Sequence, residues 1–202
     1  MSTTKPSRNA IRSSFKGLLM CSLIASGAAQ AQDSETTWFG EVAEGEWLAG
    51  IKLGAMSPDI EGFDDAGAAT LVFGYQFARP AGDRGRSSIE VELGVSEYSD
   101  INATEARGTG EYDAHTFGVF FNYRSPGTVY FKGKAGILDS NIDAQYDSGL
   151  DEKYHDTAFA YGLGFGVRLG GSDSRSTLEA EWMAATGDTD VQFYNLGLNI
   201  EF

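Results

Sequence analysis

The sequence predicts an all-β fold, an eight-stranded antiparallel up-and-down β-barrel that crosses a membrane. Three observations predict it: a secretory leader opens the chain, eight runs then alternate apolar with small or polar residues, and the last run ends on an aromatic residue, Phe202. Each run holds about ten residues, which matches a tilted strand that crosses a bilayer. Strands of soluble β-sandwiches are shorter, at about five or six residues.

Residues 1–31 have the composition of a secretory signal peptide. A basic lead without acidic residues precedes the apolar stretch GLLMCSLIASGAA, which is too short to span a bilayer as a helix. An A-x-A site then ends at Ala31, where we expect cleavage. Cys21 follows Met20 inside the apolar stretch, which does not fit a lipidated cysteine. The mature chain therefore has no cysteine and needs no disulfide.

The predicted mature chain is strongly acidic. Of the 15 basic residues in the chain four lie in the leader, which leaves 11 against 29 acidic residues and a net charge of −18. This excess disfavours nucleic acid as a partner, because phosphate binding depends on Lys and Arg. It allows divalent cations or basic proteins as partners.

The first four expected strands alternate in the period of two that is typical of β-structure, and turn-forming residues follow them. Their outward positions are Trp47, Ala49, Ile51 and Leu53 in residues 46–56; Ala69, Leu71, Phe73, Tyr75 and Phe77 in 68–78; Ile89, Val91, Leu93 and Val95 in 87–97; and Phe117, Val119, Phe121 and Tyr123 in 115–124.

The last four expected strands continue this pattern to the end of the chain. Their outward positions are Val129, Phe131, Gly133, Ala135 and Ile137 in residues 128–138; Phe159, Tyr161, Leu163, Phe165, Val167 and Leu169 in 158–170; Leu178, Ala180, Trp182 and Ala184 in 177–185; and Tyr194, Leu196, Leu198, Ile200 and Phe202 in 193–202. The final strand must pair with the first to close the barrel, because an open sheet edge is not tolerated in lipid. Its terminal aromatic resembles the signal that the barrel assembly machinery reads.

The expected connections are short on one side of the membrane and long on the other, which is the usual asymmetry of such barrels. With both chain ends in the periplasm, the periplasmic turns are residues 79–86, 125–127 and 171–174. The outward loops are residues 57–67, 97–114, 139–157 and a short one at 186–190.

Residues 47–202 resemble the small eight-stranded outer-membrane β-barrel family that includes the OmpA transmembrane domain and OmpX-like proteins. The segment AYGLGFGVRLG at 160–170 and the last strand carry the resemblance. We therefore expect a signal peptide at 1–31, a short periplasmic segment at 32–46 and a barrel at 47–202. The leader and the Phe202 ending predict that the barrel is integral to the outer membrane of a Gram-negative cell. The chain stops at Phe202, so we do not expect the peptidoglycan-binding domain of the full OmpA plan.

The opposite face of the strands predicts the lumen. An eight-stranded barrel is just filled by its side chains, and unpaired charges there are costly, so the charged residues are expected to form salt bridges. We expect Arg168 beside Glu179 and Glu181, and Lys132 and Lys134 reaching Glu90 or Glu92. The predicted lumen network is Lys52, Glu90, Glu92, Lys132, Lys134, Arg168, Glu179, Glu181 and Glu201.

No catalytic, metal or cofactor site is expected. His115 lies on the lipid face at the outer rim, with no serine two residues on. His155 lies in an outer loop between Tyr154 and Asp156. Residues 139–150 begin like a calcium loop, but Ala144 and Leu150 replace the glycine and glutamate of that template. The glycines of 160–170 imitate a dinucleotide motif, but no helix follows them.

The expected function is therefore that of a non-enzymatic, monomeric outer-membrane barrel with a structural or surface-interaction role. Its expected partners are outer-membrane lipids and lipopolysaccharide, the barrel assembly machinery, and an extracellular ligand bound through the loops, which vary freely on a fixed scaffold. Two alternatives stay open: a lipid A-modifying enzyme, since catalytic triads assemble from distant residues, and a narrow passive diffusion channel.

Overall fold

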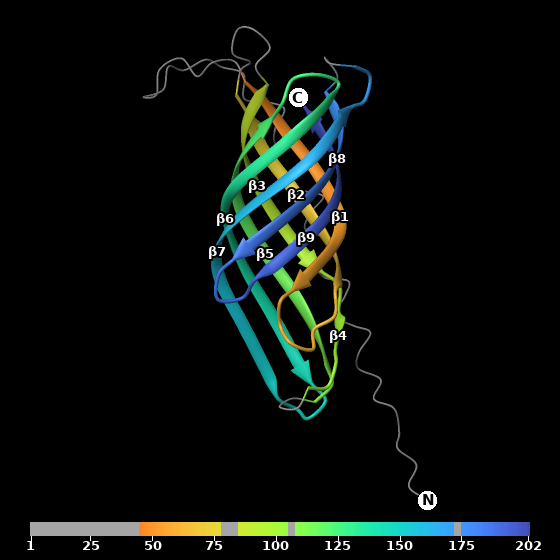
Figure 1. Cartoon of the computed structure of the whole chain (residues 1–202), viewed down its shortest axis with the longest axis vertical. Coiled ribbons are helices and arrows are strands. Elements are labelled where there is room, and N and C mark those ends of the chain that lie inside the picture. Colours follow the sequence, from red (N-terminus) through yellow and green to blue (C-terminus); the bar gives the residue numbers. More distant parts are fainter. Residues whose placement is uncertain (1–44, 78–84, 105–107, 172–174) are drawn as a thin grey trace, which may run out of the picture. The chain divides into compact units, whose positions relative to one another are not determined.

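The computed structural model describes residues 45–77, 85–104, 108–171 and 175–202. The predicted signal peptide and almost all of the predicted segment 32–46 lie outside the described residues. The described chain is built of β-strands (Figure 1). In this part of the chain, no helix has the length and apolar character needed to span a membrane.

Nine strands follow one another in the described residues, eight long and one short. They are β1 (Glu46–Pro58), β2 (Ala66–Gln76), β3 (Arg86–Ser96), the short β4 (Ser99–Ile101), β5 (Gly110–Arg124), β6 (Val129–Tyr146), β7 (Asp151–Arg168), β8 (Ser176–Thr186) and β9 (Val191–Glu201).

The eight long strands close into an antiparallel barrel, which confirms the predicted fold class. Each pairs with the next long strand along the chain, and β1 pairs with β9 from Leu48 opposite Glu201 to Pro58 opposite Val191. Trp47 and Phe202 extend this seam, because the amide of each donates to the carbonyl oxygen of the other at 3.0 and 2.9 Å. The last strand thus pairs with the first, as the sequence predicted.

One predicted loop is wrong. Residues 139–157 are mostly strand, because β6 and β7 are 18 residues long each and pair from Val129 opposite Val167 to Gln145 opposite Asp151. Only a tight turn at 147–150 separates them. The prediction also missed β4 and began β5 too late, at 115 instead of Gly110.

We name the two ends of the barrel by their connections. The turn end holds the chain's last residue and the connections after β2, β5 and β7, and the loop end holds the other connections (Figure 1). At the loop end β5, β6 and β7 project beyond their neighbours, since β7 pairs with β8 only as far as Phe159 opposite Thr186. We call this projecting sheet the extension: β4, residues 110–114 of β5, 139–146 of β6 and 151–157 of β7.

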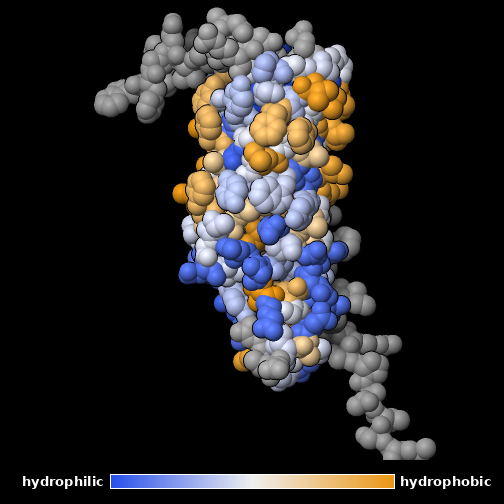
Figure 2. All heavy atoms as spheres, viewed as in Figure 1, coloured by the Kyte–Doolittle hydropathy of each residue, from blue (hydrophilic) through white to orange (hydrophobic). Residues whose placement is uncertain are grey.

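The outer face changes character along the strands. From the turn end to about the base of the extension it is apolar, and Figure 2 shows this band giving way to hydrophilic residues toward the loop end. On β6 the exposed outward residues change from Val129, Phe131 and Ile137 to Asn141 and Gln145. An apolar band that ends in polar residues is the outer surface expected of a barrel in a bilayer.

Candidate functional site

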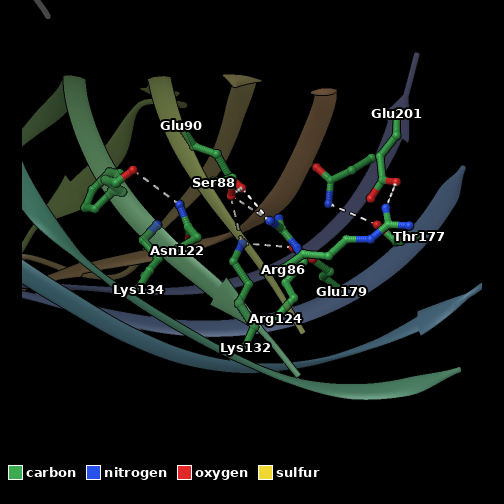
Figure 3. A network of polar contacts seen from close by, with 12 residues as sticks. Arg86, Ser88, Glu90, Asn122, Arg124, Lys132, Lys134, Thr177, Glu179 and Glu201 are labelled. Carbon is green, nitrogen blue, oxygen red and sulfur yellow. Dashed lines mark hydrogen bonds and ion pairs between the residues drawn. The ribbon is translucent and has the colours of Figure 1, made fainter. Parts of the chain in front are cut away.

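The lumen toward the turn end holds eight charged side chains, each 5% exposed or less. Four are cations and four are anions, so the group is neutral. Figure 3 shows part of it, with side chains converging from opposite walls of the barrel. We call these residues the lumen network: Lys52, Glu90, Glu92, Arg124, Lys132, Lys134, Glu179 and Glu181.

Two glutamates of β8 lie at the centre of the lumen network. Glu179 accepts hydrogen bonds from Arg124 Nε at 2.7 Å, from Lys132 Nζ at 2.9 Å and from the Tyr130 hydroxyl at 2.7 Å. Three ammonium groups surround Glu181, with those of Lys52 and Lys132 at 2.8 Å and that of Lys134 at 3.0 Å.

Two glutamates of β3 complete the network from the opposite wall. Glu90 pairs with Arg124 at 2.6 Å and accepts a hydrogen bond from Ser88 at 2.7 Å. Glu92 pairs with Lys52 at 2.7 Å and with Lys134 at 2.9 Å. Every cation of the network contacts at least two carboxylates. Removing such charges from water costs little enough free energy only when they are paired and hydrogen-bonded in this way.

The lumen network contains seven of the nine residues that the sequence assigned to the lumen. Arg168 and Glu201 are buried too, but they lie outside the lumen network. Arg168 donates to the carbonyl oxygen of Gly127 and lies over the Tyr130 ring at 4.5 Å. The arginine bound to Glu179 is Arg124, which the sequence analysis missed. The sequence could have identified Arg124. Odd-numbered residues of 115–124 face lipid, so an even-numbered residue of this strand faces the lumen.

A second ion-pair cluster lies at the turn end. Arg86 pairs with Glu201 on β9 and with Glu46 on β1, the latter at 3.3 Å. The prediction placed Arg86 in a periplasmic turn, but it is the first residue of β3. The cluster therefore ties β3 to both strands of the closing seam.

Toward the loop end the lumen is apolar, which the sequence analysis did not foresee. Five large side chains from five strands are each 4% exposed or less and belong to one packed cluster; we call them the apolar layer: Met56, Phe120, Leu138, Met183 and Phe193. Lys134 Nζ lies 3.9 Å from the centre of the Phe120 ring, so the apolar layer contacts the lumen network directly. Beside Met56 and Phe193 an enclosed void of about 170 Å³ remains, which Thr70 and Thr116 also line.

The inner face of the extension continues this apolar cluster. Phe63, in the β1–β2 loop, packs on Tyr112 and Tyr154, with ring centres 4.7 and 6.0 Å apart. The Tyr112 hydroxyl donates to the carbonyl oxygen of Asp64. Burial raises the pKa of Tyr112 to about 12, so this donor keeps its proton at neutral pH.

Both histidines lie on the outer face of strands, so the expectation that His155 lies in a loop is wrong. His155 Nδ1 is 3.0 Å from Asn141 Oδ1, and His115 Nε2 is 3.3 Å from a carboxylate oxygen of Asp113. Within the described residues no hydroxyl forms a hydrogen bond with either ring. The Thr157 hydroxyl donates instead to Asp139, whose carboxylate also lies 3.7 Å from His155 Nε2. The described residues also hold no cluster suited to a metal ion.

The profile of the outer membrane protein beta-barrel domain matches residues 18–202. The chain belongs to that family. It is therefore an integral protein of the outer membrane. No curated protein sequence matches it significantly.

Several solved structures are similar to this chain. The attachment invasion locus protein Ail of Yersinia pestis, in complex with a heparin analogue, is 15% identical with a TM-score of 0.52 over 78% of this chain and 97% of that one. Neisserial surface protein A is 12% identical, TM-score 0.48, over 78% and 97%. The amino-terminal barrel of Pseudomonas aeruginosa OprF is 18% identical, TM-score 0.42, over 79% and 100%.

Proposed function

We propose that this protein is a non-enzymatic, monomeric outer-membrane barrel with a closed lumen, whose loop end contacts molecules outside the cell. The observation that carries the proposal is the composition of the lumen, in which a neutral, buried lumen network meets an apolar layer. The large side chains of the apolar layer lie across the path that water would take through the barrel. The part of the molecule left to interact is the extension, whose outer face is polar and lies beyond the apolar band.

The orientation follows from the predicted signal peptide and from the connections. Export through the periplasm, followed by insertion with the short turns inward, leaves the extension on the cell surface. Lipopolysaccharide then surrounds the outer part of the apolar band. The last strand, with Phe202 outward and Glu201 inward, is the segment that the barrel assembly machinery would read.

Planar-bilayer recording tests the closed lumen. We expect little or no conductance from the unmutated protein. Arg124→Ala alone should stay closed, because the apolar layer still excludes water. Adding Phe120→Ala and Phe193→Ala should open a conducting path, whereas Phe121→Ala, on the lipid face, should not. A large, steady conductance from the unmutated protein would replace the proposal with the diffusion-channel alternative.

One feature favours the lipid A-modifying alternative: each histidine on the outer face lies near a carboxylate. His115 Nε2 is 3.3 Å from Asp113, and His155 Nε2 is 3.7 Å from Asp139. A hydrolase also needs a nucleophile within reach of the imidazole, and no described hydroxyl forms a hydrogen bond with either ring. Mass spectra of lipid A from cells with and without the protein decide the matter. We expect identical spectra, and loss of an acyl chain that depends on His115 or His155 would establish an enzyme.

A further inference from the structure

One asparagine of the chain has the sequence pattern of an N-glycosylation acceptor. The pattern is Asn-x-Ser/Thr without proline at x, and residues 102–104 read Asn-Ala-Thr. None of the other five asparagines has serine or threonine two residues on. Asp100 lies two residues before Asn102, so the stretch reads Asp-Ile-Asn-Ala-Thr. An acidic residue at that place extends the pattern to the form that bacterial oligosaccharyltransferases select.

The fold places this pattern on the surface of the loop end. Asn102 directly follows β4, and its side chain is exposed, as are those of Asp100 and Ala103. Ile101 between them is 2% exposed and belongs to the apolar cluster, which anchors the segment. Three of the other asparagines are buried in the lumen: Asn122, Asn195 and Asn199. The acceptor pattern thus coincides with an exposed connection, which is where a bulky, hydrophilic glycan can be carried.

The side-chain amide of Asn102 can take a sugar in the folded protein. Its Nδ2 atom donates to Asp64 Oδ1 in the β1–β2 loop at 2.8 Å, and this contact is exposed to solvent. A primary amide nitrogen carries two hydrogens. A sugar on Nδ2 replaces one of them, and the other can still donate to Asp64. The folded loop end therefore accommodates a glycan at Asn102 without loss of this hydrogen bond.

The backbone contacts of the pattern indicate when a transferase can reach it. The Asn102 amide donates to the Gly62 carbonyl at 2.7 Å, and the Asp64 amide donates to the Asp100 carbonyl at 3.1 Å. The β1–β2 loop thus holds the segment on both sides of Ile101, and a transferase would have to pull it away to bind it. The chain crosses the periplasm before its strands pair in the outer membrane. At that stage the pattern is accessible.

We propose that Asn102 is the acceptor of an N-linked glycan, attached in the periplasm before the barrel folds. The donor is an oligosaccharide joined to a polyprenyl lipid through pyrophosphate. The Nδ2 atom attacks the anomeric carbon of the first sugar, and the bond from that carbon to the pyrophosphate oxygen breaks. The lipid pyrophosphate leaves with the electron pair of the broken bond, and the proton that Nδ2 loses passes to a base of the transferase.

A glycan at this place lies beside the carboxylates of Asp64 and Asp100. In the orientation that the proposed function gives the barrel, it projects outside the cell from the border of the extension. It adds bulk and hydrogen-bonding groups to a surface that is already polar. The attachment itself does not depend on which end of the barrel faces outward, so its test is independent of the tests of the proposed function.

Mass spectrometry of the full protein, purified from the outer membrane of the cells that produce it, is the experiment. Trypsin cuts after Arg86 and Arg107, and the peptide between them contains Asn102 as its only asparagine. We expect this peptide to carry the mass of an oligosaccharide, and electron-transfer fragmentation to place that mass on Asn102. The unmodified peptide alone, or a sugar on Thr104 in place of Asn102, overturns the proposal.

Two matched pairs of variants test the pattern. Thr104→Ser keeps the hydroxyl and should keep the glycan, whereas Thr104→Ala should lose it. Asp100→Glu keeps the charge and should keep the glycan, whereas Asp100→Asn should lose most of it. Equal modification within either pair overturns the proposal. Heat-modifiable mobility of all four variants shows that they fold, so a loss of glycan cannot be ascribed to failed assembly.

The deletion of Phe202 tests the timing. This variant should assemble poorly, which leaves unfolded chain in the periplasm. Because attachment precedes folding, that unfolded chain should carry the glycan on Asn102 as fully as the assembled barrel does. A glycan confined to the assembled barrel overturns the proposal.

Discussion

Replacing Arg124 with methionine tests whether the lumen network acts as a unit. Arg124 is 1% exposed and contacts Glu90 and Glu179 at 2.6 and 2.7 Å. The substitution leaves three cations with four carboxylates in a space that excludes water. Removal of one partner of a buried ion pair costs about 3–5 kcal/mol, because the remaining charge stays buried. We expect a loss of that size in the free energy of unfolding.

The double variant Arg124→Met with Glu90→Gln supplies the decisive comparison. It restores the balance to three cations and three carboxylates, and the new amide can still contact Ser88. The double variant should therefore be less destabilised than the sum of the two single variants, by about 2 kcal/mol. Phe121→Met, on the lipid face of the same strand, is the matched control and should cost much less.

The assay is urea unfolding of the barrel from phospholipid vesicles, followed by tryptophan fluorescence. Additivity of the two single variants within about 0.5 kcal/mol would show that Arg124 and Glu90 act independently. A cost below about 1 kcal/mol for Arg124→Met would show that the lumen is hydrated enough to screen the charge that is left. Either result would refute the reasoning about a dry, balanced lumen.

Three further outcomes are expected. Leu163→Arg, near the middle of the apolar band, should cost about 2–4 kcal/mol of unfolding free energy in the same assay. Its cross-strand neighbour Gly133 has open space around it, so Gly133→Leu should be tolerated. A larger cost for Gly133→Leu than for Leu163→Arg would mean that the lipid face is misassigned. Deletion of Phe202 removes the paired hydrogen bonds with Trp47 and should impair heat-modifiable assembly in cells. Phe63→Ala should speed amide exchange at Asn102 by loosening the β1–β2 loop, and exchange at the seam should not change.

The barrel itself could be predicted because one rule governs every residue of its wall within the membrane. A strand that separates lipid from a packed lumen must alternate, and runs such as Phe159 to Leu169 show that alternation with little interference. The alternation of residues between the two faces of a strand is enough to place Lys132, Glu179 and their neighbours in the lumen. It did not select contacts, because Arg124, Lys132 and Arg168 are on the same face, and only the shear of the barrel decides which of them reaches Glu179.

The extension escaped prediction because its alternation is inverted. Within the bilayer the apolar residues point outward, whereas beyond it Ile142, Ala144 and Tyr146 point inward and the polar residues between them face water. The period of two continues through residues 139–146, but the sign of the pattern changes at the membrane border. A search for outward apolar runs therefore ends β6 too early and takes the rest for a loop.

The neutral lumen also determines where the charge of the molecule resides. Since the lumen network cancels, the acidic excess of the chain must lie elsewhere, and the described residues of the loop end carry many carboxylates against a single lysine, Lys153. Among the described residues, the loop end is thus the negative end of the barrel axis. This negative end attracts a local atmosphere of cations, repels other anionic surfaces at low ionic strength, and steers basic molecules over about one Debye length, about 10 Å at 0.1 M salt.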